Sequence, residues 1–278
     1  MIDSNCPICK KKTNEKVELK FVVLFYCKKC KHRFTNKNLI KNPEKYQIKY
    51  FSTTHSNWFD NPDYVLFNTL SSFLKKNFSK KFSLLDIGCG NGNFLKYISK
   101  KINNISLTGI DHLKNKKNKK VRFLKGDIEK NKNLRKYDVV ISNMVIEHIE
   151  DVGKFILIQK KLCKKNGFII NITINESSFL YKISRVLNFL KISKPMEMLY
   201  DKHHLNHFSV NSLKVLFKKK KMHGSIVKLS QFNIHALTLP SDNFFIKNFL
   251  KLLILIIYQI ENFLRNTNQQ TIIYKNTK

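Results

Sequence analysis

Apolar and polar positions follow two kinds of pattern over the middle of the chain. Short runs of mainly apolar residues predict five buried strands, at 83–87, 105–110, 121–125, 137–143 and 168–174. Segments with apolar residues three and four positions apart predict helices at 65–73, from 92 onward and up to 163. This succession predicts an α/β domain with a mostly parallel sheet, whose ligands bind at the carboxyl ends of the strands.

Beyond residue 174 the pattern predicts further elements around this sheet. An amphipathic stretch at 175–194 and a helix at 210–221 precede two strands, 226–229 and 233–239, which bring the sheet to seven. Residues 244–264 predict an apolar helix that is shorter in its uncharged part than the ~20 residues of a membrane span. It therefore either packs on the domain or lies in a membrane interface. Residues 266–278 are predicted to be a polar tail.

Three glycines at alternate positions follow Asp86 at the end of the first strand. Gly88, Gly90 and Gly92 predict a tight turn in which a bound molecule lies against the backbone, because a Cβ would hold it off. The helix that begins here directs unpaired N–H groups at the same place. The spacing differs from the Gly-x-Gly-x-x-Gly of dinucleotide folds, and the alternative is an ordinary glycine-rich turn.

Polar residues also follow the ends of the next strands. Asp111 lies twenty-five positions after Asp86 and can accept hydrogen bonds from both hydroxyls of a ribose. Asp127 and Ile128 follow the third strand, and Asn143 ends the fourth. Their common position at strand ends predicts one ligand site at that edge of the sheet.

The glycine turn resembles motif I of class I S-adenosylmethionine (SAM) dependent methyltransferases, and residues 145–149 resemble that family's Val-Leu-Glu-His-Val signature. The resemblance, of the small-molecule type, covers roughly residues 45–240 and implies a Rossmann-like seven-stranded methyltransferase sheet. It implies that SAM is held by Asp86, Gly88, Gly90, Gly92, Asp111, Asp127, Ile128 and Asn143. In such enzymes Asp127 would receive the adenine amino group, and the Ile128 amide would face the ring.

The resemblance also gives a meaning to two aromatic and apolar stretches. Aromatic residues before the first strand often form a flap over the cofactor in this family, and packing on the outside of the sheet is the alternative. These residues are Tyr46, Tyr50, Phe51, Trp58 and Phe59. The amphipathic stretch at 175–194 falls where such enzymes have a substrate lid.

Three histidines are the candidates for a general base. His148 follows the fourth strand, and His204 and His207 lie in a segment that resembles the His-x-x-x-Phe-Ser acceptor segment of many small-molecule methyltransferases. A hydroxyl acceptor needs such a base to take its proton. Alternatively, His148 caps or packs the helix that follows. The three histidines of the later segment, His203, His204 and His207, could also suggest a metal site, but they lack a matching carboxylate cluster.

Two Cys-x-x-Cys pairs near the start of the chain predict a metal centre. Cys6, Cys9, Cys27 and Cys30, with seventeen residues between the pairs, match a four-thiolate zinc ribbon around a short hairpin at 17–26. Paired disulfides or a redox pair are the alternatives. A reducing compartment argues against disulfides, and redox chemistry needs no second pair. We expect Cys89 and Cys163 to be packing residues.

The composition is strongly basic, with 52 Lys and Arg against 19 Asp and Glu and a formal charge of +33. Such a charge attracts RNA or an anionic membrane surface, but the lysines are spread along the chain, which favours solvated faces. No apolar leader follows the first residues, so we expect a cytoplasmic protein, possibly associated with a membrane surface.

Three functions compete. The first is methyl transfer from SAM to oxygen of a small-molecule, sugar or lipid-linked acceptor. The second is RNA methylation with the ribbon and basic surface holding the RNA. An exocyclic base nitrogen is an unsuitable acceptor, because residues 142–145 lack the Pro-Pro motif of base-amino methyltransferases. The third is a non-catalytic ribbon module on a methyltransferase-like scaffold, which the retained acidic and glycine residues oppose.

The predicted division of the chain has three regions. Residues 1–40 form the zinc ribbon, 41–240 the methyltransferase domain, and 241–278 the apolar helix with its tail.

Overall fold

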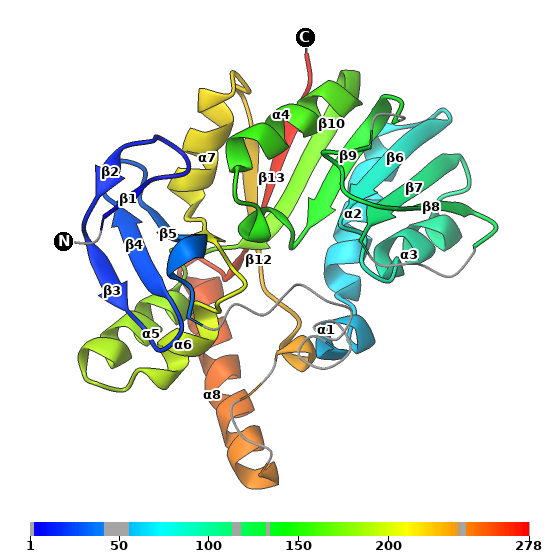
Figure 1. Ribbon diagram of the computed structural model, residues 1–278. Coiled ribbons are helices and arrows are strands. Elements are labelled where there is room, and N and C mark those ends of the chain that lie inside the picture. Colours follow the sequence, from blue (N-terminus) through cyan, green and yellow to red (C-terminus); the bar gives the residue numbers. More distant parts are fainter. Residues whose placement is uncertain are drawn as a thin grey trace.

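A computed structural model describes residues 3–41, 56–112, 118–131, 134–237, 239 and 243–277. Its centre is a seven-stranded sheet in the order β12-β13-β10-β9-β6-β7-β8 (Figure 1). The strands are β6 (Phe82–Ile87), β7 (Ile105–Asp111), β8 (Val121–Lys125), β9 (Tyr137–Asn143), β10 (Cys163–Ile174), β12 (Ile226–Ser230) and β13 (Gln269–Lys275). The expected Rossmann-like α/β sheet is confirmed.

The strand order reverses between β6 and β9. β6 pairs in parallel with β7 on one side and with β9 on the other. From β6 the sheet continues through β7 to β8 in one direction, and through β9 to β10 in the other. In a doubly wound sheet this reversal leaves a crevice at the carboxyl ends of the two strands, where ligands bind. The glycine turn after β6 opens into that crevice.

Helices cover both faces of the sheet, as the alternating burial of its strands requires. α2 and α3 pack on one face with Leu84, while α4 and α7 pack on the other with Leu85. The helices are α1 (Ser56–Asp60), α2 (Tyr64–Asn77), α3 (Asn93–Lys101), α4 (Val152–Leu162), α5 (Phe179–Phe189), α6 (Lys194–Leu199), α7 (Val210–Lys219) and α8 (Phe244–Phe263). Successive side chains of a strand point to opposite faces, so an unbroken apolar run serves both layers.

The last strand of the sheet is not where the sequence pattern indicated. The prediction of a strand at 233–239 is wrong, because Ile234–Ala236 form a 3-10 turn. The prediction of a polar tail at 266–278 is also wrong, because β13 lies antiparallel between β10 and β12. Its polar side chains are buried but bonded: Gln270 Nε2 donates to the carbonyls of Ile174 and Phe208 at 2.7 and 2.8 Å. The polar residues at the start of β13 therefore led to the wrong prediction for a strand inside the sheet.

The N-terminal region forms a small sheet of its own in the order β11-β5-β4-β3, beside a two-stranded sheet of β1 and β2. Its strands are β1 (Ser4–Asn5), β2 (Lys12–Thr13), β3 (Lys16–Glu18), β4 (Val23–Cys27) and β5 (His32–Thr35). The hairpin expected at 17–26 is confirmed by the pairing of β3 with β4. The fourth strand, β11 (Asn206–His207), comes from the far part of the chain. The boundaries of the three predicted regions remain a prediction.

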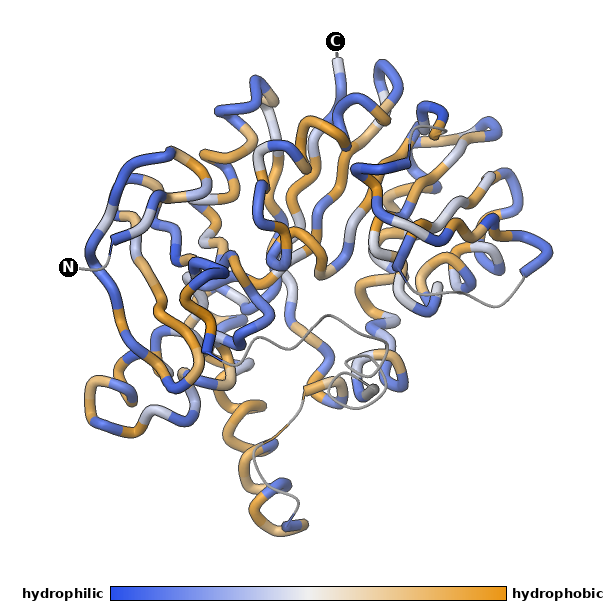
Figure 2. Tube along the Cα trace, in the orientation of Figure 1, coloured by the Kyte–Doolittle hydropathy of each residue, from blue (hydrophilic) through white to orange (hydrophobic). Residues whose placement is uncertain are grey.

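α8 extends away from the body and is mostly apolar along its length (Figures 1 and 2). Phe244, Phe245 and Phe249 are 71%, 80% and 60% exposed, whereas Glu261 near its other end is buried and accepts from the Leu180 amide at 3.0 Å. One end of the helix is thus fastened to α5, and the other presents apolar side chains to solvent. No helix within the described ranges is long and apolar enough to cross a membrane.

Candidate functional site

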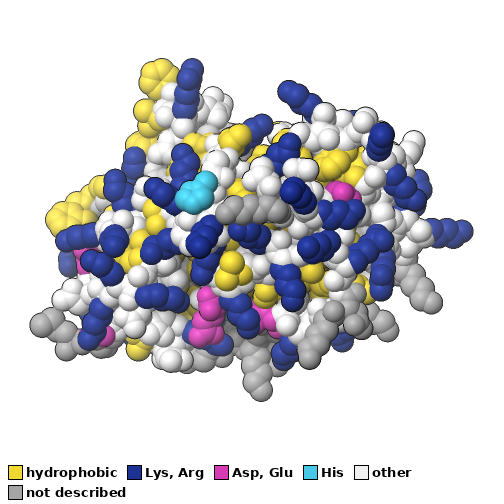
Figure 3. Space-filling model, turned by 90° about the horizontal axis from the view of Figure 1, so that it is seen from above, with side chains coloured by type: hydrophobic (Ala, Val, Ile, Leu, Met, Phe, Trp, Pro, Cys, Tyr) yellow, Lys and Arg dark blue, Asp and Glu magenta, His cyan; other side chains and the backbone are white. Residues whose placement is uncertain are grey.

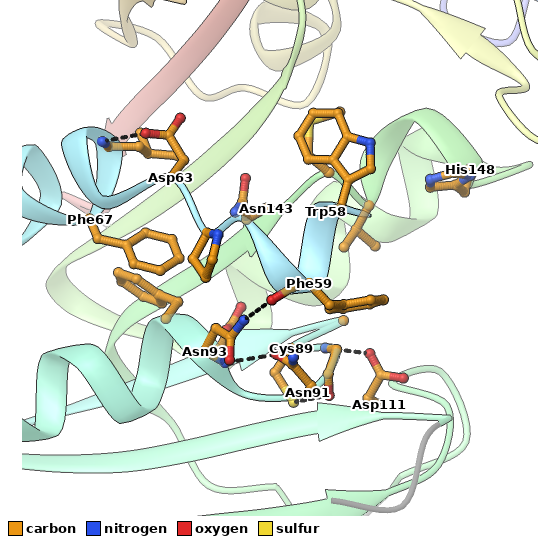
Figure 4. Close-up of a pocket in the computed structure, with 18 of the residues that line it drawn as sticks. Trp58, Phe59, Asp63, Phe67, Cys89, Asn91, Asn93, Asp111, Asn143 and His148 are labelled. Atoms are coloured by element: carbon orange, nitrogen blue, oxygen red, sulfur yellow. Dashed lines mark hydrogen bonds between the residues drawn. The ribbon is translucent and has the colours of Figure 1, made fainter. Parts of the chain in front are cut away.

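A cavity of about 650 Å³ lies at the carboxyl ends of β6, β7 and β9 (Figure 4). Seven of the residues predicted for the site line it: Asp86, Gly88, Gly90, Asp111, Asn143, His148 and His204. Strands β6, β7 and β9 end at the same edge of the sheet, so residues far apart in the chain meet there.

Two neighbouring side chains, Val145 and Phe59, lie against the glycines of the turn after β6. Gly88 and Gly90 have φ angles of +71° and +54°. A Cβ on Gly88 would lie 2.4 Å from Cγ2 of Val145, and one on Gly90 would lie 2.7 Å from Cε1 of Phe59. Both positions therefore require glycine for conformation and for space. The Gly90 amide donates to Oδ2 of Asp111 at 2.8 Å, which links the turn to the end of β7.

Asp86 and Asp111 form an acidic pair at the base of the cavity. Asp86 is 3% exposed, and its Oδ1 has no hydrogen-bond partner among the described residues. Burial raises the pKa of Asp86 well above its usual range, and the nearby Asp111 carboxylate raises it further. A buried acceptor without a partner is costly, so this carboxyl fits a ligand that brings a donor or a positive charge.

The short helix α1 forms a wall of the cavity beside the glycine turn. Trp58 and Phe59 line the cavity, and Asn93 Nδ2 at the start of α3 donates to the Phe59 carbonyl at 2.8 Å. Trp58 packs edge-on against Phe232, with ring centroids 5.4 Å apart. Two of the aromatic residues expected before the first strand therefore reach the site. Tyr46, Tyr50 and Phe51 lie outside the described residues.

His148 and His204 face each other on the opposite side of the cavity, with ring centroids 4.8 Å apart. Nδ1 of His148 lies 2.8 Å from the carbonyl oxygen of His203. Because a carbonyl only accepts, Nδ1 carries the proton in this hydrogen bond, and Nε2 is the basic nitrogen of the neutral ring. That arrangement suits His148 to proton removal.

Glu147, in the 3-10 turn η3 (Ile146–His148), adds a carboxyl group that the sequence analysis did not match to the histidines. Its Oε2 accepts from Thr173 Oγ1 at 2.9 Å, and burial raises its pKa to about 7. One ligand atom each of Glu147, His148 and His204 lies within 4.8 Å of the others. The structure thus brings one carboxylate to His148 and His204, and the three groups could hold a divalent cation.

Four predicted site residues do not line the cavity. Gly92, with φ +78°, caps the start of α3, and Asp127 accepts from the Glu129 amide at 2.8 Å in its own turn. Ile128 also lies outside the lining, so its contact with a cofactor remains a prediction of the resemblance. His207 is fully buried in β11, and burial holds its pKa well below the usual range. Its position does not support a direct role as the base.

Asp63 and Gln269 line the cavity but were missed. Asp63 accepts from the Leu66 amide at 2.9 Å as the cap of α2, and burial raises its pKa. A Pro-Asp pair ahead of a predicted helix is a capping signal, which could have marked it. Gln269 enters from β13, whose run of β-branched and aromatic residues, Thr271 to Tyr274, could have indicated a strand.

The four predicted ligands of the ribbon lie together. Their sulfur atoms are all within 4.8 Å of one another, and Sγ of Cys9 and Cys27 are 3.6 Å apart. A tetrahedral zinc with Zn–S bonds near 2.3 Å needs sulfurs roughly 3.8 Å apart. Lys10 and Lys31, which directly follow the second cysteine of each pair, have φ angles of 62° and 52°. The donor set, its spacing and both turns therefore fit a structural zinc site.

Two of the four thiols, Cys6 and Cys30, resist ionisation because they are buried. Burial raises the pKa of Cys6 to about 12 and raises that of Cys30 as well. Hydrogen bonds from the Lys11 amide and the neighbouring thiols outweigh burial at Cys9 and lower its pKa. A metal bound here would have to displace protons, so its affinity would fall as the pH falls.

The chain is similar to known methyltransferases in sequence and in fold. The sequence model of a family described as "Methyltransferase domain" matches residues 58–220. A ubiquinone biosynthesis O-methyltransferase of Rickettsia typhi is 36% identical over 118 residues, which are 39% of this chain and 47% of that protein. The enzyme of that name from Pelagibacter ubique is 30% identical over 168 residues, 50% of this chain and 69% of its own. The chain thus spans about half the length of the first relative.

A solved structure gives the same fold. The plantazolicin methyltransferase BpumL, in complex with a triazolic desmethylPZN analog and SAH, superposes with a TM-score of 0.55. It covers 83% of this chain and 92% of its own, at 20% sequence identity.

Proposed function

This chain belongs to the methyltransferase-domain family, and from that premise we propose that it transfers a methyl group from SAM to an oxygen atom. The acceptor we propose is a small, sugar-bearing or lipid-linked molecule. The observation that carries the proposal is the histidine pair, His148 and His204, in one cavity with the glycine turn and Asp86.

The residues of the turn would hold the cofactor. Asp86 has the buried acceptor atom that a positively charged or donating group would satisfy, and Gly88 and Gly90 let a ligand approach the backbone. Asp111 is suited to the ribose hydroxyls by its place at the end of β7. When bound, SAM supplies a methyl group on a sulfonium, which is already electrophilic.

The chain's own chemical task is then to place a hydroxyl and to remove its proton. His148 Nε2 would accept that proton as the acceptor oxygen forms its bond to carbon. Glu147 lies against the same ring, and as an anion it would stabilise the imidazolium that results. The remaining rate enhancement comes from holding the two reacting atoms in line at roughly 3 Å.

The walls of the cavity favour an apolar or aromatic acceptor. Trp58, Phe59 and Met144 line it, and its volume is typical of small-molecule sites. The relatives named as ubiquinone biosynthesis O-methyltransferases support a phenolic oxygen. RNA is the weaker alternative, because the lysines are spread along the chain and are not gathered on one element. The face seen from above Figure 1, which is not the face of the cavity, likewise has Lys and Arg scattered between apolar side chains, without a single basic track (Figure 3).

We also propose two finer features. A zinc ion held by Cys6, Cys9, Cys27 and Cys30 would stabilise the N-terminal ribbon, which is too small to fold on its apolar core. The exposed apolar face of α8 would rest on an anionic membrane surface and hold the enzyme near a lipid-linked acceptor. The proposed site of action is the cytoplasmic side of that membrane.

The test uses labelled SAM with three acceptors: a prenylated catechol in vesicles, a soluble sugar nucleotide and RNA. We expect label in the prenylated catechol, and a loss of about 10²–10⁴-fold in rate for His148→Ala without loss of affinity for S-adenosylhomocysteine (SAH), the demethylated product. His223→Ala, an exposed histidine, is the matched control and should act as wild type. Label in RNA alone would replace this function with the second one. SAH binding without transfer to any acceptor would favour the non-catalytic scaffold.

A further inference from the structure

The segment that carries His204 is built into the cysteine ribbon. β11, directly after this histidine, pairs antiparallel with β5, so that Asn206 is opposite Phe34 and His207 is opposite Arg33. The Thr35 amide donates to the Leu205 carbonyl at 2.9 Å. The ribbon sheet is therefore completed by the acceptor segment.

Side chains extend this connection to the predicted metal ligands. Asn211 Nδ2 donates to the Cys30 carbonyl at 3.0 Å, and Ser209 Oγ donates to the Lys31 carbonyl at 2.6 Å. His32 Nε2 lies 3.1 Å from Asn206 Oδ1 in a buried contact. The second Cys-x-x-Cys turn is thus bonded directly to residues 206–211.

The opposite side of the same segment contacts the candidate base. The Leu205 amide donates to the Glu147 carbonyl at 2.8 Å, and Asn206 Nδ2 donates to the Ile149 carbonyl at 2.7 Å. The His203 carbonyl bonds the ring of His148. Residues 203–206 therefore lie between the ribbon and the 3-10 turn that bears both Glu147 and His148.

A second connection joins the ribbon to α5 and α6, the helices of the stretch that the resemblance predicts as a substrate lid and that are called the lid below; none of the described residues that line the cavity comes from them. Glu176 is 2% exposed and forms ion pairs with Arg33 of β5 and with Arg185 of α5. Tyr200, after α6, donates to the same carboxylate oxygen at 2.8 Å. A buried carboxylate is stable only while its partners stay in place, so β5 and α5 are held together through it.

We propose that metal binding at the four cysteines organises the acceptor side of the site, by fixing β5 and through it the position of His204 and the lid. A metal would cross-link Cys6 and Cys9 to Cys27 and Cys30 just ahead of β5. Without that cross-link, β5 is held within the ribbon only by strand pairing and by the packing of Phe25 and Phe34. If β5 is not held in place, β11 loses the strand that it pairs with, and Glu176 loses its ion pair with Arg33. The cofactor side, formed by β6, β7 and α3, shares none of these bonds and should be unaffected.

The test is hydrogen–deuterium exchange of the full chain, as purified and after removal of metal with a chelator, with no acceptor present. We expect chelation to speed exchange by roughly tenfold or more in residues 203–209 and in β4 and β5. Residues 82–87 and 105–111 should not change, and the affinity for SAH by calorimetry should stay within about twofold. These measurements need no acceptor and do not depend on the proposed function. Weaker binding of the acceptor after metal removal does depend on it, and would be measured separately as a higher KM for the acceptor.

A second variant tests the coupling while metal stays bound. Arg33→Met should speed exchange in 176–200 and keep a full metal content, and Lys29→Met, an exposed charge on the same ribbon, is the matched control. Three results would overturn the proposal: faster exchange in β4 and β5 alone, loss of protection in the whole chain, or no bound metal and no response to the chelator.

Discussion

At the scale of single residues, the site depends on a few positions where the backbone conformation or the burial of the side chain restricts which amino acid can be present. Gly88 and Gly90 are in the left-handed region, and each meets a side chain where a Cβ would be. Asp86 and Glu147 are carboxyl groups whose burial raises their pKa. These features are properties of the empty cavity, so they can be tested without knowing the acceptor.

Gly90→Ala should weaken SAH binding by roughly tenfold or more, because the new methyl group forces Phe59 or the turn to move. Gly224→Ala is the control, since Gly224 has a similar φ of +73° but no atom within 4 Å of its Cβ position. Both variants should lose about 1 kcal/mol of folding stability from the left-handed backbone. Calorimetry and thermal unfolding measure the two effects. Equal SAH affinities in the two variants would contradict the role assigned to the turn.

Glu147 should make folding stability fall as the pH rises. Its folded pKa of about 7 lies above its usual value of 4.5, so between these values the folded chain binds more protons than the unfolded chain. The shift corresponds to roughly 3 kcal/mol, lost as the pH rises from about 4.5 to 7. Glu147→Gln should therefore gain stability relative to wild type at pH 8 but not at pH 4.

The exposed Glu150 supplies the control for this measurement, as Glu150→Gln should leave the slope unchanged. Unfolding free energies would be measured in urea at several pH values. Parallel slopes for Glu147→Gln and wild type would show that Glu147 does not titrate as its burial implies.

At the scale of elements, much of the apolar surface of α8 is not used by the fold. Its contacts with α5 and with the turn at Ile234–Ala236 hold one end, and that turn also contacts α1 beside the cavity. The exposed half carries Lys247 and Lys251 and no acidic residue. A helix with such a face gains free energy at an anionic lipid surface, where the acceptor cavity would lie close to the bilayer.

Flotation with anionic vesicles should show binding of the wild type at low salt and weaker binding at high salt, since screening removes the lysine contribution. The variant Phe245→Ser/Phe249→Ser should bind several-fold more weakly, because both rings are exposed and contribute nothing to the core. Leu229→Ser, a partly exposed residue on β12, is the control. Equal flotation of all three proteins would exclude α8 as the contact.

At the scale of the whole molecule, the sequence was informative where structure is local. The alternation of strands and helices and the turn after Asp86 depend on neighbours a few positions apart, and the five strands at 83–174 were predicted from them. β13 escaped prediction because its glutamines and threonine are paired by strands and carbonyls distant in the chain. β11 has two residues, too few to show an alternation of apolar and polar positions, and it pairs with β5 of the ribbon, which is far away in the chain. Glu147 lies near His204 because residues 203–206 pack against η3, and this contact between distant parts of the chain cannot be seen in the sequence.

The position of β13 has a consequence for how the protein is made. Residues 168–174 of β10 need residues 269–275 as their partner, and β12 reaches the sheet only through β13. While the chain is being synthesised, β10 therefore has an open edge until α8 and β13 have left the ribosome. Open strand edges and late, non-local pairing favour aggregation and slow folding. Chaperone dependence during synthesis should follow, and loss of the last strand should be more damaging than its polar sequence suggests.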